Sequence, residues 1–207
     1  LADSRVDAAQ VDEVILGCVL PAGMGQAPAR QAAIGAGVPA SVPATTINKV
    51  CGSGMKALML GADAIRAGSA RVVVAGGFES MSNAPYLLLK ARQGYRMGHG
   101  QLLDHMLYDG LQNPYDGALM GHFADVTARQ YGFTREQQDA FAAESVRRAL
   151  AACEGGAFAE EIVAVTISTR RGEQRFERDE PPFKCDLARI PSLKPAFDPD
   201  GTVTAAS

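Results

Sequence analysis

The residue best suited to chemistry is Cys51, which stands in the segment TTINKVCGSGMKALMLGADAIRAG, residues 45–68. A β-branched run precedes it, and Gly52, Ser53 and Gly54 follow before a helical pattern begins. A thiol between the end of a strand and the start of a helix meets the positive end of the helix dipole, which favours the thiolate. The small residues let a substrate carbonyl approach the backbone, whose amides can hold a developing oxyanion. On this motif alone, a nucleophile and a small buried hydrophobic residue are equally good interpretations.

The chain around Cys51 predicts a parallel sheet covered by helices. Short apolar or β-branched runs alternate with alanine-rich or amphipathic runs that end at glycines. Such alternation with short links is typical of α/β proteins, in which ligands gather at the carboxyl ends of the strands. The expected strands are 12–20, 44–50 and 71–77, and the expected helices are 27–37 and 52–68. Within the second helix, apolar residues recur at helical spacing: Met55, Leu58, Met59, Ala62 and Ile65.

The second half of the chain is expected to be less regular at first. After residue 81 the periodicity is weak as far as 117. The sequence TREQ, which begins at Thr134, matches a capping box with Gln137 and predicts a helix that stops at Gly155. Its apolar face is expected to use Phe141, Val146 and Leu150. The other expected elements are a helix at 118–131, a strand at 161–168, a charged, proline-broken loop after it, and a strand in DGTVTAAS, 200–207.

Composition narrows the function classes. The 207 residues carry a net charge of −3 with a pI near 5.6, which argues against nucleic acid as a partner. No apolar run approaches the ~18–20 residues of a membrane-spanning helix, and residues 1–10 lack a secretory signal pattern, so no membrane partner is expected. Four cysteines without a Cys-x-x-Cys pair suit a reducing compartment, and we expect a cytoplasmic location. Three histidines without ligand spacing predict no metal site.

Two long motifs, in order along the chain, resemble the thiolase family. They are the nucleophile segment NKVCGSGMKA, residues 48–57, and AGGFESMSNAP, residues 75–85. GHFADVTARQYGFTREQQDAFA (121–142) and LKPAFDPDGTVTAAS (193–207) are similar to the family as well, so the resemblance spans almost the whole chain. The sequence around the nucleophile also separates this chain from ketoacyl synthases, which share the thiolase fold.

The resemblance implies a fold class and a domain organisation. The fold is expected to be α/β, a thiolase-like layered α/β/α half-fold with a mostly parallel sheet and an inserted loop domain, incomplete at both ends. Residues 1–81 would form the subdomain with the nucleophile, 82–198 a loop domain that binds CoA and substrate, and 199–207 a strand that returns to the first subdomain. Family members are homodimers or homotetramers, and the segment TTIN, residues 45–48, would meet its copy across the twofold axis.

The resemblance also implies an acyltransferase. Cys51 matches the family cysteine that takes an acyl group from a thioester, after which CoA or an acetyl-CoA-derived carbanion takes it from the enzyme. The reaction would be condensation of two acetyl-CoA to acetoacetyl-CoA, or thiolytic cleavage of 3-ketoacyl-CoA. CoA is then a co-substrate, and no permanently bound cofactor is expected. Acetyl transfer is favoured because VPATTINKVCGSGMKA is most similar to that branch of the family.

Four more residues match substrate-binding positions of the family. Met120 matches a methionine that lines the acyl pocket, and Leu111 matches an apolar residue near the pantetheine arm. Lys184 and Arg189 are candidates for the CoA phosphates, because the family arginine that follows an Asp-Glu pair in this loop is replaced. Leu119 stands where many short-chain thiolases have a histidine. By residue type alone, Met120 is better explained as a core residue and the charged loop as solvated.

Several family residues have no counterpart in these 207 residues: the histidine that activates the nucleophile, the second cysteine that acts as acid and base, and an Asn-Glu segment. The sequence offers no reason to recruit His99, His105 or His122 in their place. The chain alone is therefore expected to show no thiolase turnover. The alternatives are a non-catalytic half-thiolase that binds CoA or assists assembly, and an unrelated α/β protein with a buried cysteine.

The remaining polar and sulfur-bearing side chains near the motifs are expected to be structural. Asn48 and Ser53 should support the turn rather than react. For Glu79 a structural role is favoured, as an ion near the site or as a buried hydrogen-bond partner. No functional role is predicted for the other cysteines, which are Cys18, Cys153 and Cys185.

Overall fold

A computed structural model of the protein describes residues 4–207. The chain forms two compact units: unit 1 ends at Gly117, and unit 2 runs from Ala118 to Ser207. The sequence predicted domain boundaries at residues 81 and 198, with residues 82–198 as a domain that binds CoA. Because that division rests on a function, CoA binding, it stays a prediction.

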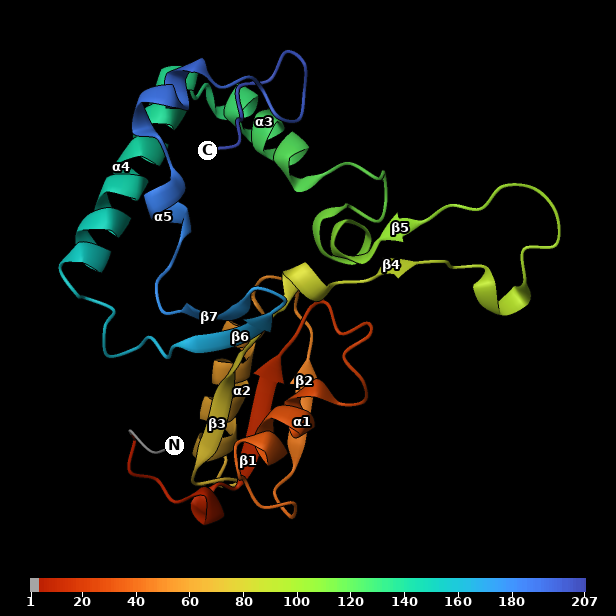
Figure 1. Ribbon diagram of the computed structural model, residues 1–207, viewed down its shortest axis with the longest axis vertical. Coiled ribbons are helices and arrows are strands. Elements are labelled where there is room, and N and C mark those ends of the chain that lie inside the picture. Colours follow the sequence, from red (N-terminus) through yellow and green to blue (C-terminus); the bar gives the residue numbers. More distant parts are fainter. Residues whose placement is uncertain (1–3) are drawn as a thin grey trace. The chain divides into compact units, whose positions relative to one another are not determined.

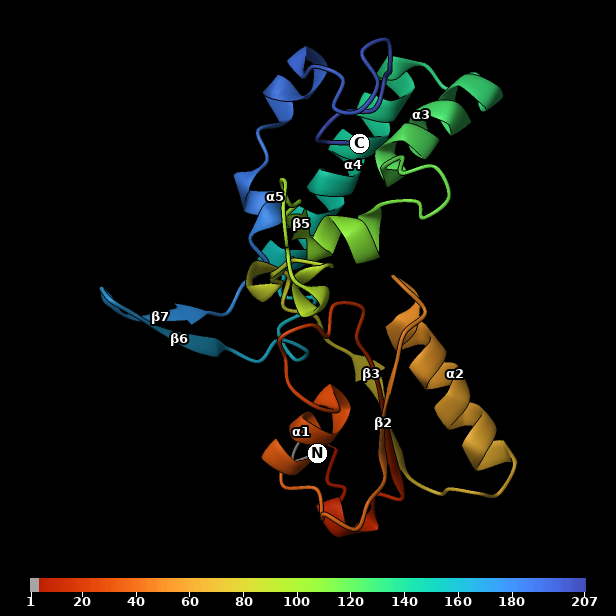
Figure 2. The same ribbon diagram turned by 90° about the vertical axis from the view of Figure 1, so that its right-hand side faces the viewer.

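Unit 1 is built on a three-stranded parallel sheet. Helices α1 and α2 cover opposite faces of this sheet, as Figure 2 shows. Each helix connects two parallel strands, which is the arrangement that the alternation of strands and helices predicted. The α/β fold class is therefore confirmed. The strands are β1 (Glu13–Gly17), β2 (Ala44–Ile47) and β3 (Val73–Gly77), in the order β2-β1-β3, and the helices are α1 (Pro28–Gly35), α2 (Ser53–Arg66) and the short 3-10 helix η1 (Ala8–Gln10).

The apolar core of unit 1 lies between the sheet and α1. Val14 of β1 is 1% exposed, and Ala33 of α1 packs in the same cluster. Side chains along β1 are buried because it is the central strand and helices cover both faces of the sheet. The buried members of the cluster are Val11, Val14, Ala33, Val38 and Val42.

Helix α2 packs on the other face through small residues. Its buried residues are Ser53, Ala57 and Gly61, and a Cβ at Gly61 would lie only 3.1 Å from Cγ1 of Val73. The sequence predicted this helix from a stripe of apolar residues at helical spacing. Such a stripe usually faces the core, but here it points outward. The helix lies too close to the sheet for large side chains, which therefore take the outer face. Met55, Leu58, Met59 and Ile65 are 71%, 58%, 53% and 48% exposed.

The closest approach between α2 and the sheet is at the last residue of β1. A Cβ at Gly17 would lie 2.5 Å from Cβ of Ser53 and 2.6 Å from its carbonyl carbon. A Cβ at Gly77, the last residue of β3, would lie 3.2 Å from Cα of Gly54. Glycines at the strand ends therefore let the N-terminus of α2 lie directly against the carboxyl ends of β1 and β3.

Residues 82–117 belong to unit 1 and are mostly irregular, as expected. Two short antiparallel strands stand at the base of an extended loop (Figure 1), and residues 86–104 are called the arm below. The elements of this region are η2 (Met81–Asn83), β4 (Tyr86–Leu87), η3 (Ala91–Gln93), β5 (Leu103–Asp104) and the π-helix η4 (Leu107–Leu111).

Unit 2 contains the two helices expected from the sequence, α3 (Met120–Tyr131) and α4 (Arg135–Glu154). The Thr134 hydroxyl accepts from the amide of Gln137 at 3.2 Å, and the Gln137 side chain accepts from the amide of Thr134 at 2.9 Å. The predicted capping box is thus confirmed. The expected apolar face of α4 is wrong in part, because Phe141 is 80% exposed, while Asp139 and Ala142 are buried.

Two expectations for the end of the chain are wrong. The charged loop contains a second strand, β7 (Gly172–Phe176), which pairs with β6 (Val165–Thr169) in a hairpin; both are exposed on both faces, so no periodic burial marks them. Residues 200–207 form no strand, because the amides of Thr202 and Val203 donate to Oδ1 of Asp125 at 2.7 and 3.0 Å. The remaining elements are α5 (Pro181–Lys184) and the 3-10 helix η5 (Leu187–Ser192).

Across residues 4–207, every helix is too short or too polar to cross a membrane. The same residues hold no group of three or more His, Cys, Asp or Glu side chains placed to bind a metal ion.

The contact at Gly17 leads to a stability prediction. We expect Gly17→Ala to lower the free energy of unfolding by about 1–3 kcal/mol, since the added methyl meets backbone that cannot move freely. Gly35→Ala is the matched control: nothing lies within 4 Å of its added Cβ, and alanine is the better helix former. Urea unfolding of both variants checks this, and equal stability of the two would contradict the packing described here.

Candidate active site

Cys51 lies on the turn that joins β2 to α2, at the carboxyl end of the sheet. It directly precedes Gly52, the N-cap residue of α2. Val50, the residue before it, has a φ of 48°, in the left-handed region that β-branched residues rarely adopt. Such strain costs about 1–2 kcal/mol and persists where surrounding contacts hold it, often at functional sites. The reversal at Val50 turns the chain from strand to helix and leaves Cys51 exposed.

Hydrogen bonds from a buried serine hold this turn. Oγ of Ser53 accepts from the amide of Lys49 at 2.8 Å and donates to the carbonyl of Val50 at 2.6 Å. The Asn48 side-chain oxygen accepts from the amide of Val50 at 2.8 Å. Because Ser53 is only 4% exposed, its two bonds are partly shielded from water. The supporting role expected of Ser53 and Asn48 is confirmed.

The first turn of α2 offers backbone donors beside the thiol. The amides of Gly52 and Ser53 donate within the turn, and the first bond that returns to the N-cap comes from Lys56. The two amides in between, those of Gly54 and Met55, donate to no group within residues 4–207. Unpaired amides at the positive end of a helix favour an anion, so this turn suits a thiolate and an oxyanion.

The loop after β1 is tied to the site by Glu79. Its carboxylate accepts from the amides of Val19 and Leu20 at 2.9 and 2.8 Å, which confirms its structural role. Cys18, the first residue of that loop, is 1% exposed. Burial, helped by the hydrogen bond to Glu79, raises the pKa of the Cys18 thiol. Cys18 is therefore held as a thiol, in contrast to the exposed Cys51.

Two of the three histidines contact carboxylates, and the third lies in the arm. His105 contacts Asp109 through Nδ1 at 2.5 Å and is 4% exposed. His122 bonds to Asp198 through Nδ1 at 2.8 Å, and this bond, with one from Arg129, lowers the pKa of Asp198. His99 is exposed in the arm. Within residues 4–207 the Cys51 thiol therefore has no hydrogen-bonded base.

The predicted substrate residues are divided between the units. Cys51 and Leu111 belong to unit 1, where Leu111 is the half-buried last residue of the π-helix η4. Met120 belongs to unit 2 as the first residue of α3, and it is 47% exposed. Its side chain is therefore accessible, unlike the core methionine that its residue type alone suggested. The roles of Leu111 and Met120 stay predictions.

The two candidate cations differ in their partners. Lys184 lies 3.0 Å from the carboxylate of Glu180, one turn away on α5. Arg189 is exposed on η5, and its guanidinium makes no ion pair with any residue in the described part of the chain. Arg189 is thus the better candidate for an external anion.

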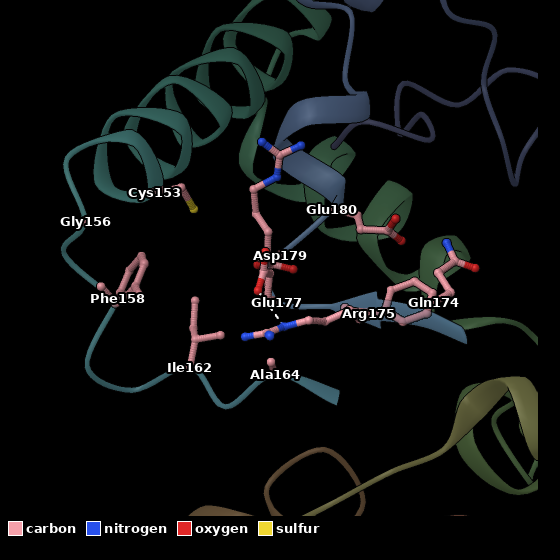
Figure 3. A pocket seen from close by; sticks show the side chains of 13 residues that line it. Cys153, Gly156, Phe158, Ile162, Ala164, Gln174, Arg175, Glu177, Asp179 and Glu180 are labelled. Carbon is pink, nitrogen blue, oxygen red and sulfur yellow. Dashed lines mark ion pairs between the residues drawn. The ribbon is translucent and has the colours of Figure 1, made fainter. Parts of the chain in front are cut away.

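A hollow of about 700 Å³ in unit 2 is poorly suited to a polyanion. Figure 3 shows Arg175 and Glu177 side by side in its wall, joined by an ion pair of 2.8 Å. Two arginines face three carboxylates in the lining, so the charge there is negative overall. The charged residues are Arg175, Glu177, Arg178, Asp179 and Glu180.

Sequence reasoning missed the strained Val50. A positive φ is usually marked by glycine or asparagine, so a valine carries no sequence signal of it.

Comparisons with known proteins bear on this site. The family model described as "Thiolase, N-terminal domain" matches residues 1–207. An acetyl-CoA acetyltransferase of Pseudomonas aeruginosa is 55% identical over 209 residues, which is 100% of this chain and 53% of that protein. One from Cupriavidus necator is 56% identical over 202 residues, 96% of this chain and 51% of that protein. The chain thus spans about half the length of these relatives.

A solved structure is similar as well. The crystal structure of Acat5 thiolase from Ascaris suum in complex with coenzyme A matches with a TM-score of 0.88 at 42% identity. The match covers 98% of this chain and 51% of that one.

The exposure of the four thiols leads to a prediction. We expect iodoacetamide at neutral pH to alkylate Cys51 first and Cys18 last, because the first is exposed at a helix N-terminus and the pKa of the second is raised. Peptide mass spectrometry of timed samples gives the order, and the chain in urea serves as the control in which all four react alike. Faster labelling of Cys153 or Cys185 in the folded chain would contradict the assignment.

Proposed function

The chain belongs to the thiolase family, and on that premise we propose that it carries the nucleophile of an acyltransferase acting on thioesters of coenzyme A. The observation that carries this proposal is the exposed thiol of Cys51 at the N-terminus of α2. The names of the two bacterial relatives support acetyl as the group transferred.

The proposed step is attack of the Cys51 thiolate on the carbonyl carbon of the thioester. A C–S bond to Cys51 forms, the bond to the CoA sulfur breaks, and the proton given up by Cys51 goes to the departing CoA thiolate. The backbone amide of Cys51 would form half of the oxyanion hole for the charge that develops on the carbonyl oxygen, as the resemblance to the family implies. The unpaired amides of Gly54 and Met55 add positive potential at the same helix terminus. The acetyl group then passes to the carbanion of a second acetyl-CoA, which forms acetoacetyl-CoA.

Thiolytic cleavage is the reverse reaction: the Cys51 thiolate attacks the 3-keto carbon of a 3-ketoacyl-CoA and the bond between C2 and C3 breaks. The leaving carbanion takes the proton that Cys51 gave up and becomes acetyl-CoA, and CoA then takes the acyl group from Cys51.

Coenzyme A is the proposed co-substrate. The thiolase from Ascaris suum, whose structure is in complex with coenzyme A, supports this assignment through its 42% identity to the chain. We assign Leu111 to the pantetheine arm, Met120 to the acyl group and Arg189 to the phosphates. Arg189 is preferred to Lys184, because Lys184 would have to give up its ion pair with Glu180. Residues 82–198 would together form the CoA-binding loop domain.

The complete reaction needs groups that these residues do not supply. The family's activating histidine and its second cysteine have no counterpart in the sequence, and His105 and His122 contact carboxylates instead. General acid–base catalysis contributes about 10²–10⁴-fold to such reactions. The chain alone is therefore proposed to be inactive in turnover, although its nucleophile is in place.

An acylation experiment tests this function. With acetoacetyl-CoA and CoA, we expect no repeated turnover by the 207-residue chain. With acetyl-CoA alone, we expect slow transfer of one acetyl group to Cys51, detected by peptide mass spectrometry. Cys51→Ser should abolish the adduct, and Cys185→Ser, at a half-buried loop position, should leave it unchanged. Sustained cleavage of acetoacetyl-CoA would refute the proposed inactivity. Failure of Cys51 to accept an acetyl group would favour the non-catalytic CoA-binding alternative.

We also propose that the chain associates with copies of itself. Strand β2 is an edge strand of the described sheet and includes residues 45–47 of the TTIN segment. Unpaired edges invite pairing with another chain. The outer face of α2 adds a stripe of exposed apolar side chains, and the arm adds Met97, which is 99% exposed. Exposed apolar surface of this kind usually marks an interface.

Size-exclusion chromatography at micromolar concentration is expected to give a dimer or a larger species. Thr45→Lys, on the exposed side of β2, should shift the chain toward monomer, because two lysines would meet where the copies pair. Ala36→Lys, at an exposed position after α1, adds the same charge and should not. A stable wild-type monomer would count against self-association.

A further inference from the structure

One buried arginine in unit 2 has no part in the proposed acyl transfer. Arg135 is the first residue of α4, and its Nε donates to both carboxylate oxygens of Asp139 at 2.9 Å. The two side chains are only 22% and 11% exposed. A buried ion pair of this kind is costly unless further hydrogen bonds satisfy the guanidinium.

Those further bonds go to the segment that contains η5. Nη2 of Arg135 donates to the carbonyls of Ile190 at 3.1 Å, Pro191 at 3.4 Å and Leu193 at 2.8 Å. Figure 1 shows the segment after α5 running beside α4, in agreement with the contacts between α4 and η5. One guanidinium therefore anchors the C-terminal end of η5 to α4.

The anchored segment carries Arg189, the candidate cation that makes no ion pair with the described residues. Ile190 is 2% exposed and is held through its carbonyl, while its neighbour Arg189 faces solvent. The backbone of Arg189 is fixed as well: its amide donates to the carbonyl of Asp186 at 3.1 Å, and its carbonyl accepts from the Ser192 hydroxyl at 2.8 Å. The Arg189 side chain thus projects from a backbone that is restrained on both sides.

We propose that Arg135 is a positioning residue for anion binding: by anchoring η5, it presents Arg189 to the phosphates of CoA. This inference rests on the proposed function, in which Arg189 meets those phosphates. An anchored cation loses less conformational freedom on binding than a mobile one, and that difference appears as affinity.

Only arginine has the donor geometry for this role. Its planar fork reaches a carboxylate on one side and carbonyls on another, whereas the lysine ammonium is a single point. Arg135→Lys keeps the charge opposite Asp139 and loses the bonds to Ile190, Pro191 and Leu193. This variant therefore distinguishes the effect of the bonds that hold η5 from the effect of the ion pair with Asp139.

The test is a double-mutant cycle on CoA binding, measured by isothermal titration calorimetry on the 207-residue chain. Arg135→Lys and Arg189→Gln are each expected to weaken CoA binding about three- to tenfold. The double variant should be no weaker than Arg189→Gln alone, because the anchor acts only through Arg189. Both variants should also lessen the salt dependence of binding, a change that a purely structural role would not cause. Arg147→Lys, in an exposed ion pair on the same helix, is the control and should bind as wild type does.

Each of the other outcomes would overturn a specific part of the proposal. A wild-type chain that does not bind CoA removes the proposed CoA site, and the inference with it. Normal binding by Arg189→Gln removes the assignment of Arg189 to the phosphates and the inference with it, whereas the proposed acyl transfer at Cys51 is untouched. Additive losses in the double variant would mean that Arg135 acts on the fold in general, and would also overturn it. If Arg135→Lys does not fold, Asp139→Asn replaces it in the double-mutant cycle. This variant weakens the acceptor of the Nε hydrogen bond of Arg135, and the same outcomes decide.

Discussion

The contact on which unit 1 depends is the close approach of α2 to the ends of β1 and β3. Gly17 and Gly77 leave no side chain between the strand ends and the first turn of the helix, where a Cβ at Gly17 would lie 2.5 Å from Ser53. That approach places the positive end of the helix at the carboxyl edge of a parallel sheet. Cys51, one residue before the N-cap, is then held where an anion is favoured. The chemistry proposed for the thiol is a consequence of this contact between backbones.

The same contact explains the surface of unit 1. A helix this close to a sheet can turn only small residues inward, which here are Ser53, Ala57 and Gly61. Four of the five large apolar residues of α2 are left on the outside, at 48% to 71% exposure: Met55, Leu58, Met59 and Ile65. A packing requirement at the site therefore generates the apolar face that makes self-association a reasonable proposal. Strain at Val50 belongs to the same arrangement, because the buried hydroxyl of Ser53 bonds to the Val50 carbonyl and holds the reversed backbone.

In unit 2, local pairing decides which cations remain available to a ligand. Arg175 pairs with Glu177 and Lys184 with Glu180, both within a few residues along the chain. Arg135 is committed to Asp139 and to three carbonyls. Arg189 has none of these partners, and its backbone is the one that Arg135 restrains. Exposed ion pairs are worth little in stability, but they reduce the positive potential that a phosphate would meet. The charge count of a loop therefore says less about anion binding than the partner of each cation.

The sequence alone determined the order of strands and helices in the parallel sheet, the position of Cys51 between a strand and a helix, and the start of α4 at Thr134. Periodicity and caps act over a few neighbouring residues, so they can be read without a structure. The long motifs also identified the family. Tertiary structure decided which face of α2 is buried, the left-handed Val50, the strand β7, and the pairing of residues 202 and 203 with Asp125 instead of a strand. Val50 and β7 are held by near neighbours, but neither a valine nor a pair of exposed strands gives a sequence signal of its conformation. The other features arise from contacts between residues far apart in the chain, such as Gly17 with Ser53 and Arg135 with Leu193. No local pattern encodes such contacts, because each depends on how closely two backbones approach after folding.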